Sequence, residues 1–302
     1  MSESVLTIGK FDGVHAGHAH LLSQVVAIAK ERGLTPAAMT FDPHPACVVA
    51  PARAPRPLMS LEERCARIRA LGIERVYVLK FTPEIAKLTP EEFVSQYVHD
   101  ELRARVVIVG GNFRFGNKQA GDPAVLGELG QRYGFETRIV QAVKLRGRVI
   151  STSEIRRCIG SGEVSLAGRL LSRPYAIEGD IVHGHGVGSK QTVPTLNLQT
   201  SAEVLPCDGV YITRTTDLDG RGTWDSITNI GMRPTFDGHA RTIETFLLGP
   251  ITSSAPSRIR LEFLRRVREE RKFDSPEALK AQILRDVLRA QTYFRRVTRW
   301  VA

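Results

Sequence analysis

Apolar and polar positions alternate with two different periods in the first half of the chain. Short β-branched runs predict strands at 5–8, 37–41, 76–79, 106–109 and 137–140, and segments of helical pattern lie between them at 17–31, 60–71, 89–102 and 122–133. Ser60 with Glu63 and Thr89 with Glu92 fit the capping box that opens a helix. Strictly alternating strands and helices predict a doubly wound parallel sheet.

The pattern changes after about residue 167. Short strands broken by glycine and proline are expected at 177–182, 210–214, 225–230, 242–247 and 258–264, which predicts a closed antiparallel barrel. One helix follows, with Ser275 as its cap and an apolar stripe of Leu279, Ile283, Val287, Ala290 and Phe294 that we expect to pack on the barrel. We therefore expect an α/β domain at 1–167 and a barrel domain with a C-terminal helix at 168–302.

Composition supports two folded domains. The chain has 302 residues, of which 42% are hydrophobic and 25% charged, so each domain can bury a core. No apolar run reaches the roughly 18 residues of a membrane span, and no signal-peptide pattern opens the chain. The four cysteines (Cys47, Cys65, Cys158 and Cys207) are far apart, as in reduced proteins. We expect a cytoplasmic protein without a membrane partner.

The net charge of +10 raises the alternative of a nucleic-acid partner. Residues 256–302 hold 13 Lys and Arg against 6 Asp and Glu, so +7 of that charge lies in the last 47 residues. The basic residues are mixed with acidic ones, and the segment carries no aromatic RNA-stacking signature. Phosphorylated small molecules account for the charge equally well, and we do not expect nucleic acid as the main partner.

The segment 9–18 reads GKFDGVHAGH and lies between the first strand and the first helix. Gly13 and Gly17 allow close approach of the backbone, and a helix N-terminus attracts anions. His15 and His18 are three residues apart and share one side of the first turn. This arrangement suits a polyphosphate and could stabilise charge when an α-phosphate is attacked. Two surface histidines at a helix start are the simpler alternative.

The pattern GxFDGxHxGH resembles the signature of nucleotidylyltransferases of the HxGH class, and in particular the family of bacterial bifunctional riboflavin kinase/FAD synthetases. Three further stretches resemble the same family in the expected order: 41–45 (FDPHP), 111–116 (GNFRFG) and 150–156 (ISTSEIR). With the later motifs, the resemblance covers nearly the whole chain. An ordered set of motifs is far more specific than a single HxGH.

The resemblance implies roles for residues of the first domain. His15 and His18 would be catalytic, and the flavin would contact Phe41, His44 and Pro45. The implied ATP-binding residues are Gly9, Phe11, Gly13, Asn112, Ser151, Thr152, Ser153 and Arg156. The segment 151–153 reads Ser-Thr-Ser where the family usually has Ser-Ser-Thr, which keeps all three hydroxyls. Asn112 replaces an aspartate found in many members, a change that affects metal affinity.

A second glycine-rich segment, 179–188, is followed by 189–197 (SKQTVPTLN). Its glycines (GHGVG at 184–188) could be mistaken for a dinucleotide-binding fingerprint, but no helix follows, so we do not interpret the segment in that way. It resembles the riboflavin kinase motif that ends in PTxN, which implies ATP contacts from Gly184, Gly188 and Lys190. Thr195 and Asn197 offer oxygen ligands suited to Mg²⁺. Ser189 stands where the family commonly has arginine, and Thr192-Val193 where it has Gly-Phe.

Glu244 lies in an alternating strand pattern, which by itself favours the solvent face. The segments 229–236 and 242–248 resemble the family's NIGxxPTF motif and the strand that carries its catalytic glutamate, and this resemblance favours a catalytic base instead. Arg268 opens a segment, 268–273, that resembles the family's RxExKF motif beside the flavin.

The sequence thus predicts a bifunctional enzyme. The barrel would phosphorylate riboflavin to FMN with ATP and Mg²⁺, and the α/β domain would adenylylate FMN to FAD and release pyrophosphate, with no covalent enzyme intermediate. Two alternatives stay open. One is an FAD synthetase with an impaired kinase barrel, because of Ser189 and Thr192. The other is a flavin-responsive regulator that binds nucleic acid through its basic C-terminus.

Overall fold

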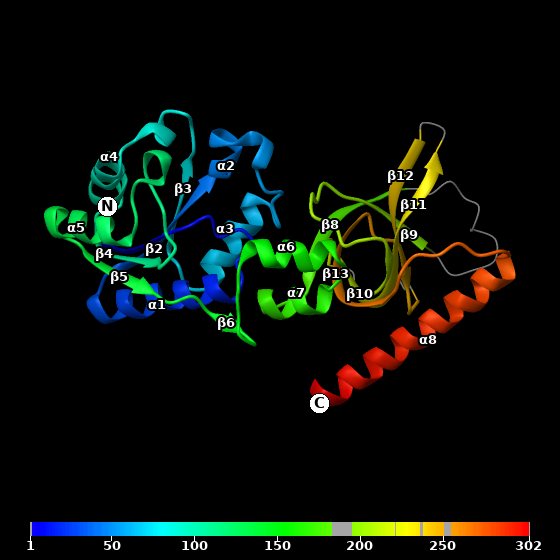
Figure 1. Ribbon diagram of the computed structural model, residues 1–302. Coiled ribbons are helices and arrows are strands. Elements are labelled where there is room, and N and C mark those ends of the chain that lie inside the picture. Colours follow the sequence, from blue (N-terminus) through cyan, green and yellow to red (C-terminus); the bar gives the residue numbers. More distant parts are fainter. Residues whose placement is uncertain (1, 183–194, 221, 236–237, 251–254, 302) are drawn as a thin grey trace. The chain divides into compact units, whose positions relative to one another are not determined.

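The computed structural model describes residues 2–182, 195–220, 222–235, 238–250 and 255–301. The chain forms two compact units, Met1–Thr152 and Ser153–Ala302 (Figure 1). Each unit has its own core, so each is described by itself below. The boundary expected between residues 167 and 168 concerns where the two activities divide, and it stays a prediction.

The first unit is built on a five-stranded parallel sheet in the order β3-β2-β1-β4-β5. Its strands are β1 (Ser4–Ile8), β2 (Thr35–Asp42), β3 (Arg75–Lys80), β4 (Ala104–Gly110) and β5 (Glu136–Val140), which confirms all five predicted strands. The strand order reverses between β1 and β4. In open α/β sheets, ligands bind at the carboxyl ends of the strands beside such a reversal.

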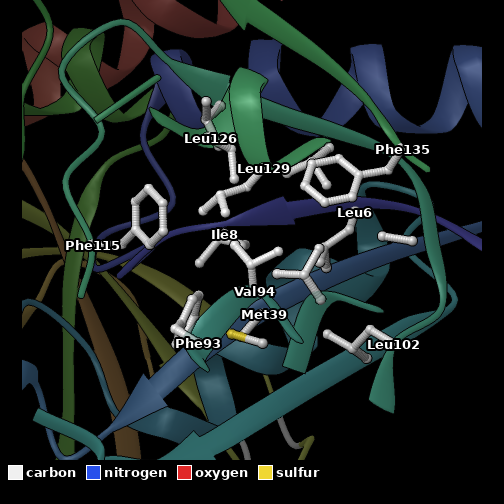
Figure 2. Close-up of a cluster of buried hydrophobic side chains, with 14 of the residues drawn as sticks. Leu6, Ile8, Met39, Phe93, Val94, Leu102, Phe115, Leu126, Leu129 and Phe135 are labelled. Atoms are coloured by element: carbon white, nitrogen blue, oxygen red, sulfur yellow. The ribbon is translucent and has the colours of Figure 1, made fainter. Parts of the chain in front are cut away.

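Two apolar clusters cover the two faces of this sheet. Within β1, Leu6 and Ile8 belong to the cluster of Figure 2, whereas Val5 belongs to the other. The alternation follows from the two-residue period of a strand. The helices α1 (Ala16–Arg32) and α3 (Leu61–Ala70) contribute to the second cluster, and α5 (Pro123–Tyr133) contributes to the first. The prediction of a doubly wound sheet is confirmed.

The helix expected at 89–102 is only partly α-helical. Thr89 and Glu92 form the predicted capping box, and α4 (Pro90–Phe93) follows it. The next segment, η3 (Val94–Glu101), is a π-helix, and the Leu102 amide donates to the Tyr97 carbonyl at 3.0 Å. The prediction of one continuous α-helix is therefore wrong. The widened turns still place Val94 and Leu102 in the core.

Several short elements connect the main ones and carry too few residues for a periodic signal. They are α2 (Pro45–Val49), η1 (Pro51–Arg53), η2 (Ile85–Lys87), η4 (Asn117–Gln119), β6 (Lys144–Leu145) and β7 (Arg148–Val149). Two further helices, α6 (Thr152–Gly160) and α7 (Val164–Leu171), lead into the barrel.

The second unit contains a closed six-stranded antiparallel barrel in the order β10-β11-β12-β9-β8-β13. Its strands are β8 (Tyr175–Val182), β9 (Thr195–Gln199), β10 (Gly209–Asp217), β11 (Thr223–Thr235), β12 (Gly238–Leu247) and β13 (Arg258–Arg268). The barrel prediction is confirmed, and β9 is the one strand of it that the pattern did not indicate.

Hydroxyl groups cross the interior of the barrel. Thr213 Oγ1 lies 2.8 Å from Ser226 Oγ and 2.8 Å from Thr228 Oγ1, and Thr228 Oγ1 lies 3.0 Å from Thr245 Oγ1. All four side chains are fully buried. Buried polar groups need such partners. The residues that alternate with these along the same strands point outward.

The C-terminal helix α8 (Pro276–Val301) begins as predicted, because Ser275 Oγ accepts a hydrogen bond from the Ala278 amide at 3.2 Å. Ala290 and Phe294 are buried with barrel residues in one cluster, and Val287 packs against it. Leu279 and Ile283 are 42% and 44% exposed. The expectation that the whole stripe packs on the barrel is therefore wrong for the first two turns of the helix.

Candidate active sites

The segment 9–18 leaves the carboxyl end of β1, next to the reversal of strand order. His15 is the N-cap of α1: its Nδ1 accepts a hydrogen bond from the His18 amide at 3.2 Å. A ring nitrogen that accepts cannot carry a proton, so the neutral His15 ring carries its proton on Nε2. His15 thus opens the helix, and this cap fixes which of its ring nitrogens carries the proton.

The rings of His15 and His18 are stacked, with centroids 3.6 Å apart and planes 13° from parallel. His18 Nδ1 is buried, and no described residue forms a hydrogen bond with it. Burial, and secondly the electrostatic repulsion that a proton on His18 would meet from a protonated His15, hold the pKa of His18 well below its usual value. His18 is therefore neutral near pH 7.

The backbone of this segment is held in conformations that suit glycine. Gly13 has φ 82°, in the left-handed region that glycine adopts without strain. A Cβ on Gly17 would lie 3.1 Å from Cε1 of His15, so a side chain there would press on the histidine ring. Phe11 is fully buried, and its ring meets that of His18 edge-on at 5.2 Å. Phe11 therefore supports the histidines from the core.

The neighbouring strands bring other predicted residues to the same edge of the sheet. β4 and β2 both run parallel to β1, one on each side. Asn112 is exposed in the turn just after β4. Phe41, near the end of β2, and His44, just after it, are both half-buried. His44 Nδ1 accepts from the Ala46 amide at 3.1 Å, so His44 caps the short helix α2 that Pro45 begins.

The segment 150–156 is divided between the two units. Ser151 and Thr152 lie in the first, where Thr152 Oγ1 donates to the Asp12 carbonyl at 3.3 Å and so meets the phosphate-binding segment. Ser153 and Arg156 lie in the second unit on α6, exposed and half-buried respectively. The hydrogen bond of Thr152 thus ties the start of this segment to the segment that carries the histidines.

A row of polar side chains crosses the outer face of the barrel. Glu244 on β12 lies directly opposite Asn197 on β9 and Asn229 on β11. Their sequence neighbours Leu196, Thr228 and Thr245 are buried inside, so the three row residues point outward. Glu244 is half-buried there. Thr195, two residues before Asn197, lies on the same face and is exposed.

Arg268 ends the same row, since Asn229 lies opposite Val210 and Val210 opposite Arg268. Its Nε donates to Asp286 Oδ2 on α8 at 2.8 Å, and its guanidinium carbon lies 5.7 Å from the centre of the Phe273 ring. Gln282 Nε2 donates to the other oxygen of Asp286, also at 2.8 Å. The helix therefore holds Arg268 beside the row.

Three predicted ATP-binding residues of the barrel, Gly184, Gly188 and Lys190, lie outside the described residues. A cavity of about 770 Å³ also lies in the second unit. Its lining comprises Gly160, Leu205, Cys207, Asp208, Met232, Arg241, Arg266, Glu269 and Glu270, none of which was a predicted site residue.

Sequence reasoning did not single out Asn229, Asp286 or Arg64, a buried arginine on α3. Asn229 opens the NIGxxPTF resemblance, so a strand-pairing argument could have found it. Asp286 lies on the same helix as the predicted stripe but carried no motif. Arg64 carried no signal in the sequence, because a charged position in a polar helix start reads as solvent-exposed.

A parallel α/β sheet with a histidine-capped phosphate segment at its switch point, joined to a barrel with a carboxylate between two amides, defines a two-site nucleotide-dependent transferase. The comparisons give the family. Residues 1–154 match the model of the FAD synthetase family and residues 171–294 that of the riboflavin kinase family. The chain belongs to the family of bifunctional riboflavin kinase/FMN adenylyltransferases, and both activities follow from its two family domains.

Relatives match over nearly the whole chain. The bifunctional riboflavin kinase/FMN adenylyltransferase of Escherichia coli strain K12 is 35% identical over 290 residues, covering 96% of this chain and 92% of that protein. The enzyme of the same name from Bacillus subtilis strain 168 is 33% identical over 299 residues, covering 97% and 93%.

A solved structure shares the fold of both units. The crystal structure of a protein from Streptococcus pneumoniae, named a macrolide-efflux protein, aligns with a TM-score of 0.85 at 29% identity and covers 94% of this chain and 92% of that one. That name describes that protein alone. In the described parts of the present chain, no helix is long and apolar enough to cross a membrane.

Proposed function

We propose that FMN adenylylation takes place at the carboxyl end of the parallel sheet and is carried out by His15 and His18. The stacked pair at the N-terminus of α1 is the observation that carries this placement. His15 offers Nε2–H, and the helix N-terminus adds amide donors for the ATP phosphates. The FMN phosphate attacks the α-phosphorus in line, and pyrophosphate leaves.

The remaining residues of this proposed site bind and orient. Gly9, Phe11 and Gly13 shape the phosphate segment, and Asn112, Ser151 and Thr152 would contact the nucleotide from β4 and from the end of the first unit. Phe41, His44 and Pro45 form the proposed flavin side at the end of β2. Ser153 and Arg156 are proposed nucleotide contacts because of the ISTSEIR motif alone.

Riboflavin phosphorylation is proposed at the outer row of the barrel. Glu244 would accept the proton of the ribityl 5′-hydroxyl as that oxygen attacks the γ-phosphorus of ATP, forming FMN and ADP. Its half-buried position between Asn197 and Asn229 supports this role. Arg268, held by Asp286 and close to Phe273, would bind the flavin.

The donor set at the edge of this row fits Mg²⁺. Thr195 and Asn197 share one face of β9, and Glu244 lies opposite Asn197, so hydroxyl, amide and carboxylate oxygens gather there. Hard oxygen donors are those that Mg²⁺ prefers. Mg²⁺ bound through Thr195 and Asn197 would neutralise charge on the ATP phosphates.

We also propose that the two activities divide between residues 1–167 and 168–302, and that the enzyme works in the cytoplasm. The four cysteines are free thiols, which fits a reducing compartment.

One alternative keeps a specific observation in its favour. Ser189 stands where the family commonly has arginine, so an FAD synthetase with an impaired kinase barrel would show weak ATP binding at the barrel.

Chromatography of products from riboflavin and MgATP tests the proposal. FAD is expected. Turnover of FMN to FAD without turnover of riboflavin would support the impaired barrel instead. No turnover of either substrate would favour a flavin-responsive regulator that binds nucleic acid. In the impaired case, Ser189→Arg should lower the kinase KM for ATP. If lysine has replaced the missing arginine, Lys190→Ala should raise that KM.

A further inference from the structure

Arg64 on α3 is one of the few buried charged residues of the first unit, with 7% of its surface exposed. Its Nη1 donates to three acceptors: the Lys10 carbonyl at 3.1 Å, Thr40 Oγ1 at 3.2 Å and the Phe41 carbonyl at 3.1 Å. Thr40 Oγ1 in turn donates to the Lys10 carbonyl at 3.1 Å. One guanidinium thus ties the chain that leaves β1 to the end of β2.

Arg64 forms no ion pair in the described structure, although its charge contributes, after the local hydrogen bonds, to the lowered pKa of the exposed Glu62. Among the described residues, its hydrogen bonds go to two carbonyls and a hydroxyl, none of which carries charge, and no carboxylate forms an ion pair with it. Its Nε is buried and makes no hydrogen bond to a described residue. Buried cations are ordinarily paired, because an unpaired buried charge is costly.

The place of this charge matches the proposed chemistry. Lys10 belongs to the phosphate-binding segment, and Phe41 begins the proposed flavin side. Adenylyl transfer brings the phosphates of ATP and FMN together at this edge of the sheet. A fixed positive charge beneath both segments would lower the repulsion between the two substrates.

We propose that Arg64 is a positioning residue of the adenylyltransferase site, which holds the phosphate segment against the flavin segment and whose counter-charge is the phosphate of the bound substrates. Its guanidinium does not act as an acid or a base. The planar guanidinium matters as well as the charge. It holds the two N–H groups of Nη1 in one fixed plane, where three acceptors share them, and a lysine ammonium on a flexible stem is not held in that plane.

Three variants in the full-length enzyme test the inference. Arg64→Gln removes the charge and the fork, Arg64→Lys keeps the charge, and Thr40→Val removes one acceptor and leaves Arg64 in place. Arg69→Gln is the matched control, since Arg69 is exposed on the same helix. The riboflavin kinase activity of the same molecules reports on the second unit.

Arg64→Gln should lower kcat/KM for FMN adenylylation by about 10²-fold, the scale on which misplaced reacting groups act. It should also weaken inhibition by added pyrophosphate. Arg64→Lys should recover the pyrophosphate inhibition but only part of kcat, and Thr40→Val should reduce kcat without changing that inhibition. Arg69→Gln and kinase turnover should match the parent.

Folding is checked by circular dichroism and by hydrogen exchange of β1 and β2 amides. If Arg64→Gln does not fold, the inference is judged on Arg64→Lys and Thr40→Val, and parent-like adenylylation in both would overturn it. Parent-like adenylylation in a folded Arg64→Gln enzyme, or an equal effect of Arg69→Gln, would overturn the inference.

The inference rests on the proposed placement of the adenylyltransferase site, which His18→Ala tests separately. If His18→Ala leaves adenylylation intact, the placement itself is wrong. If His18→Ala removes adenylylation and the Arg64 variants do not, only the role of Arg64 fails.

Discussion

His15 combines two tasks that are usually divided between residue types. Helix N-caps are commonly Ser, Thr, Asp or Asn, whose oxygen accepts from the backbone. Here an imidazole Nδ1 accepts instead, and α1 has no acidic residue in its first turn. An aspartate at this position would cap the helix but repel the phosphates. The histidine caps the helix through Nδ1 and keeps its proton on Nε2, the atom that we propose as a donor to the substrate.

His18→Ala should reduce FMN adenylylation by at least about 10²–10³-fold, the scale of losing one aligned donor to developing charge. Riboflavin phosphorylation should persist, because its proposed residues lie in the other unit. Product chromatography from riboflavin and from FMN measures both activities. His20→Ala, an exposed histidine on the same helix, is the control. Equal loss of both activities in folded His18→Ala protein would contradict the assignment.

His18 should also make the first unit less stable in mild acid. Its folded pKa is lowered, so below about pH 6.5 the unfolded chain binds a proton that the folded chain does not. The unfolding free energy therefore falls as pH falls from about 6.5 toward the folded pKa. Hydrogen exchange of α1 amides between pH 7.5 and 5.5 measures this. The decline should be shallower in His18→Ala, and identical slopes would show that His18 does not contribute.

Glu244→Gln keeps the shape of the side chain and removes the base. FMN formation should fall by about 10²–10⁴-fold, while adenylylation of supplied FMN should stay near the parent rate. Glu178→Gln is the control, since Glu178 is an exposed carboxylate on the barrel strand β8, paired with Arg260. Kinase turnover near that of the parent would mean that Glu244 is an ordinary surface carboxylate.

Residues announced by a motif could be found from the sequence, and residues that act through burial could not. His15 and His18 combine helix-start geometry with flanking glycines, so chemistry and spacing agree. For Glu244, the alternation along the strand predicts that the side chain points out of the barrel, but it does not say what covers that outer face. For Arg64, nothing in the sequence indicates a role, since only the fold reveals that this residue lies beneath two strand ends.

At the scale of the elements, α8 links packing to the proposed kinase chemistry. Its second half packs on the barrel through Ala290 and Phe294, and its middle turns hold Arg268 through Asp286, which is 2% exposed. Packing of the helix on the barrel would not by itself require the buried carboxylate of Asp286. The ion pair thus connects the position of the helix to the end of β13, where the flavin is proposed to bind.

Asp286→Ala should destabilise the second unit by about 3 kcal/mol, because breaking a buried pair leaves the partner charge unpaired. It should also raise the kinase KM for riboflavin, since Arg268 loses its anchor. Thermal unfolding and kinase kinetics measure the two effects. Glu277→Gln, an exposed acid in the first turn of α8, should cost only a few tenths of a kcal/mol. If riboflavin KM is unchanged in Asp286→Ala, Arg268 does not contact the flavin.

Elements with a strong period were predictable, and those set by tertiary context were not. The five parallel strands and the cap of α4 agree with the pattern. The π-helix η3 was not predictable, because a polar-apolar pattern does not distinguish a widened turn from an α-helix. Strand β9 has five residues and follows a long glycine-rich segment, and it becomes a strand because β8 and β12 pair with it on both sides.

At the scale of the whole molecule, each unit has a core of its own and each proposed site draws mainly on one unit. The order of the two reactions then depends on FMN, which one site makes and the other consumes. Among the basic C-terminal residues, Arg268 has a place in this picture without a nucleic acid, because it pairs with Asp286 of the same unit.

A mixture of His18→Ala and Glu244→Gln enzymes should convert riboflavin and ATP to FAD, although neither variant does so alone. FMN released by the first variant is the substrate of the second. The lag before FAD appears should shorten as the concentration of both variants rises. Time courses by chromatography measure it. Failure of the mixture, with each partial activity intact, would show that FMN passes between sites only within one molecule.

The two-residue alternation of β12 has a consequence for how the chain can change in evolution. Thr245 points into the hydroxyl network of the barrel, and Glu244 points out of it. Deleting or inserting one residue within 242–246 would exchange these directions, placing a carboxylate in the sealed interior and a threonine in the catalytic row. Insertions in the turn between β10 and β11 have no such effect. Among related barrels, we therefore expect insertions and deletions to occur at that turn and not within β12.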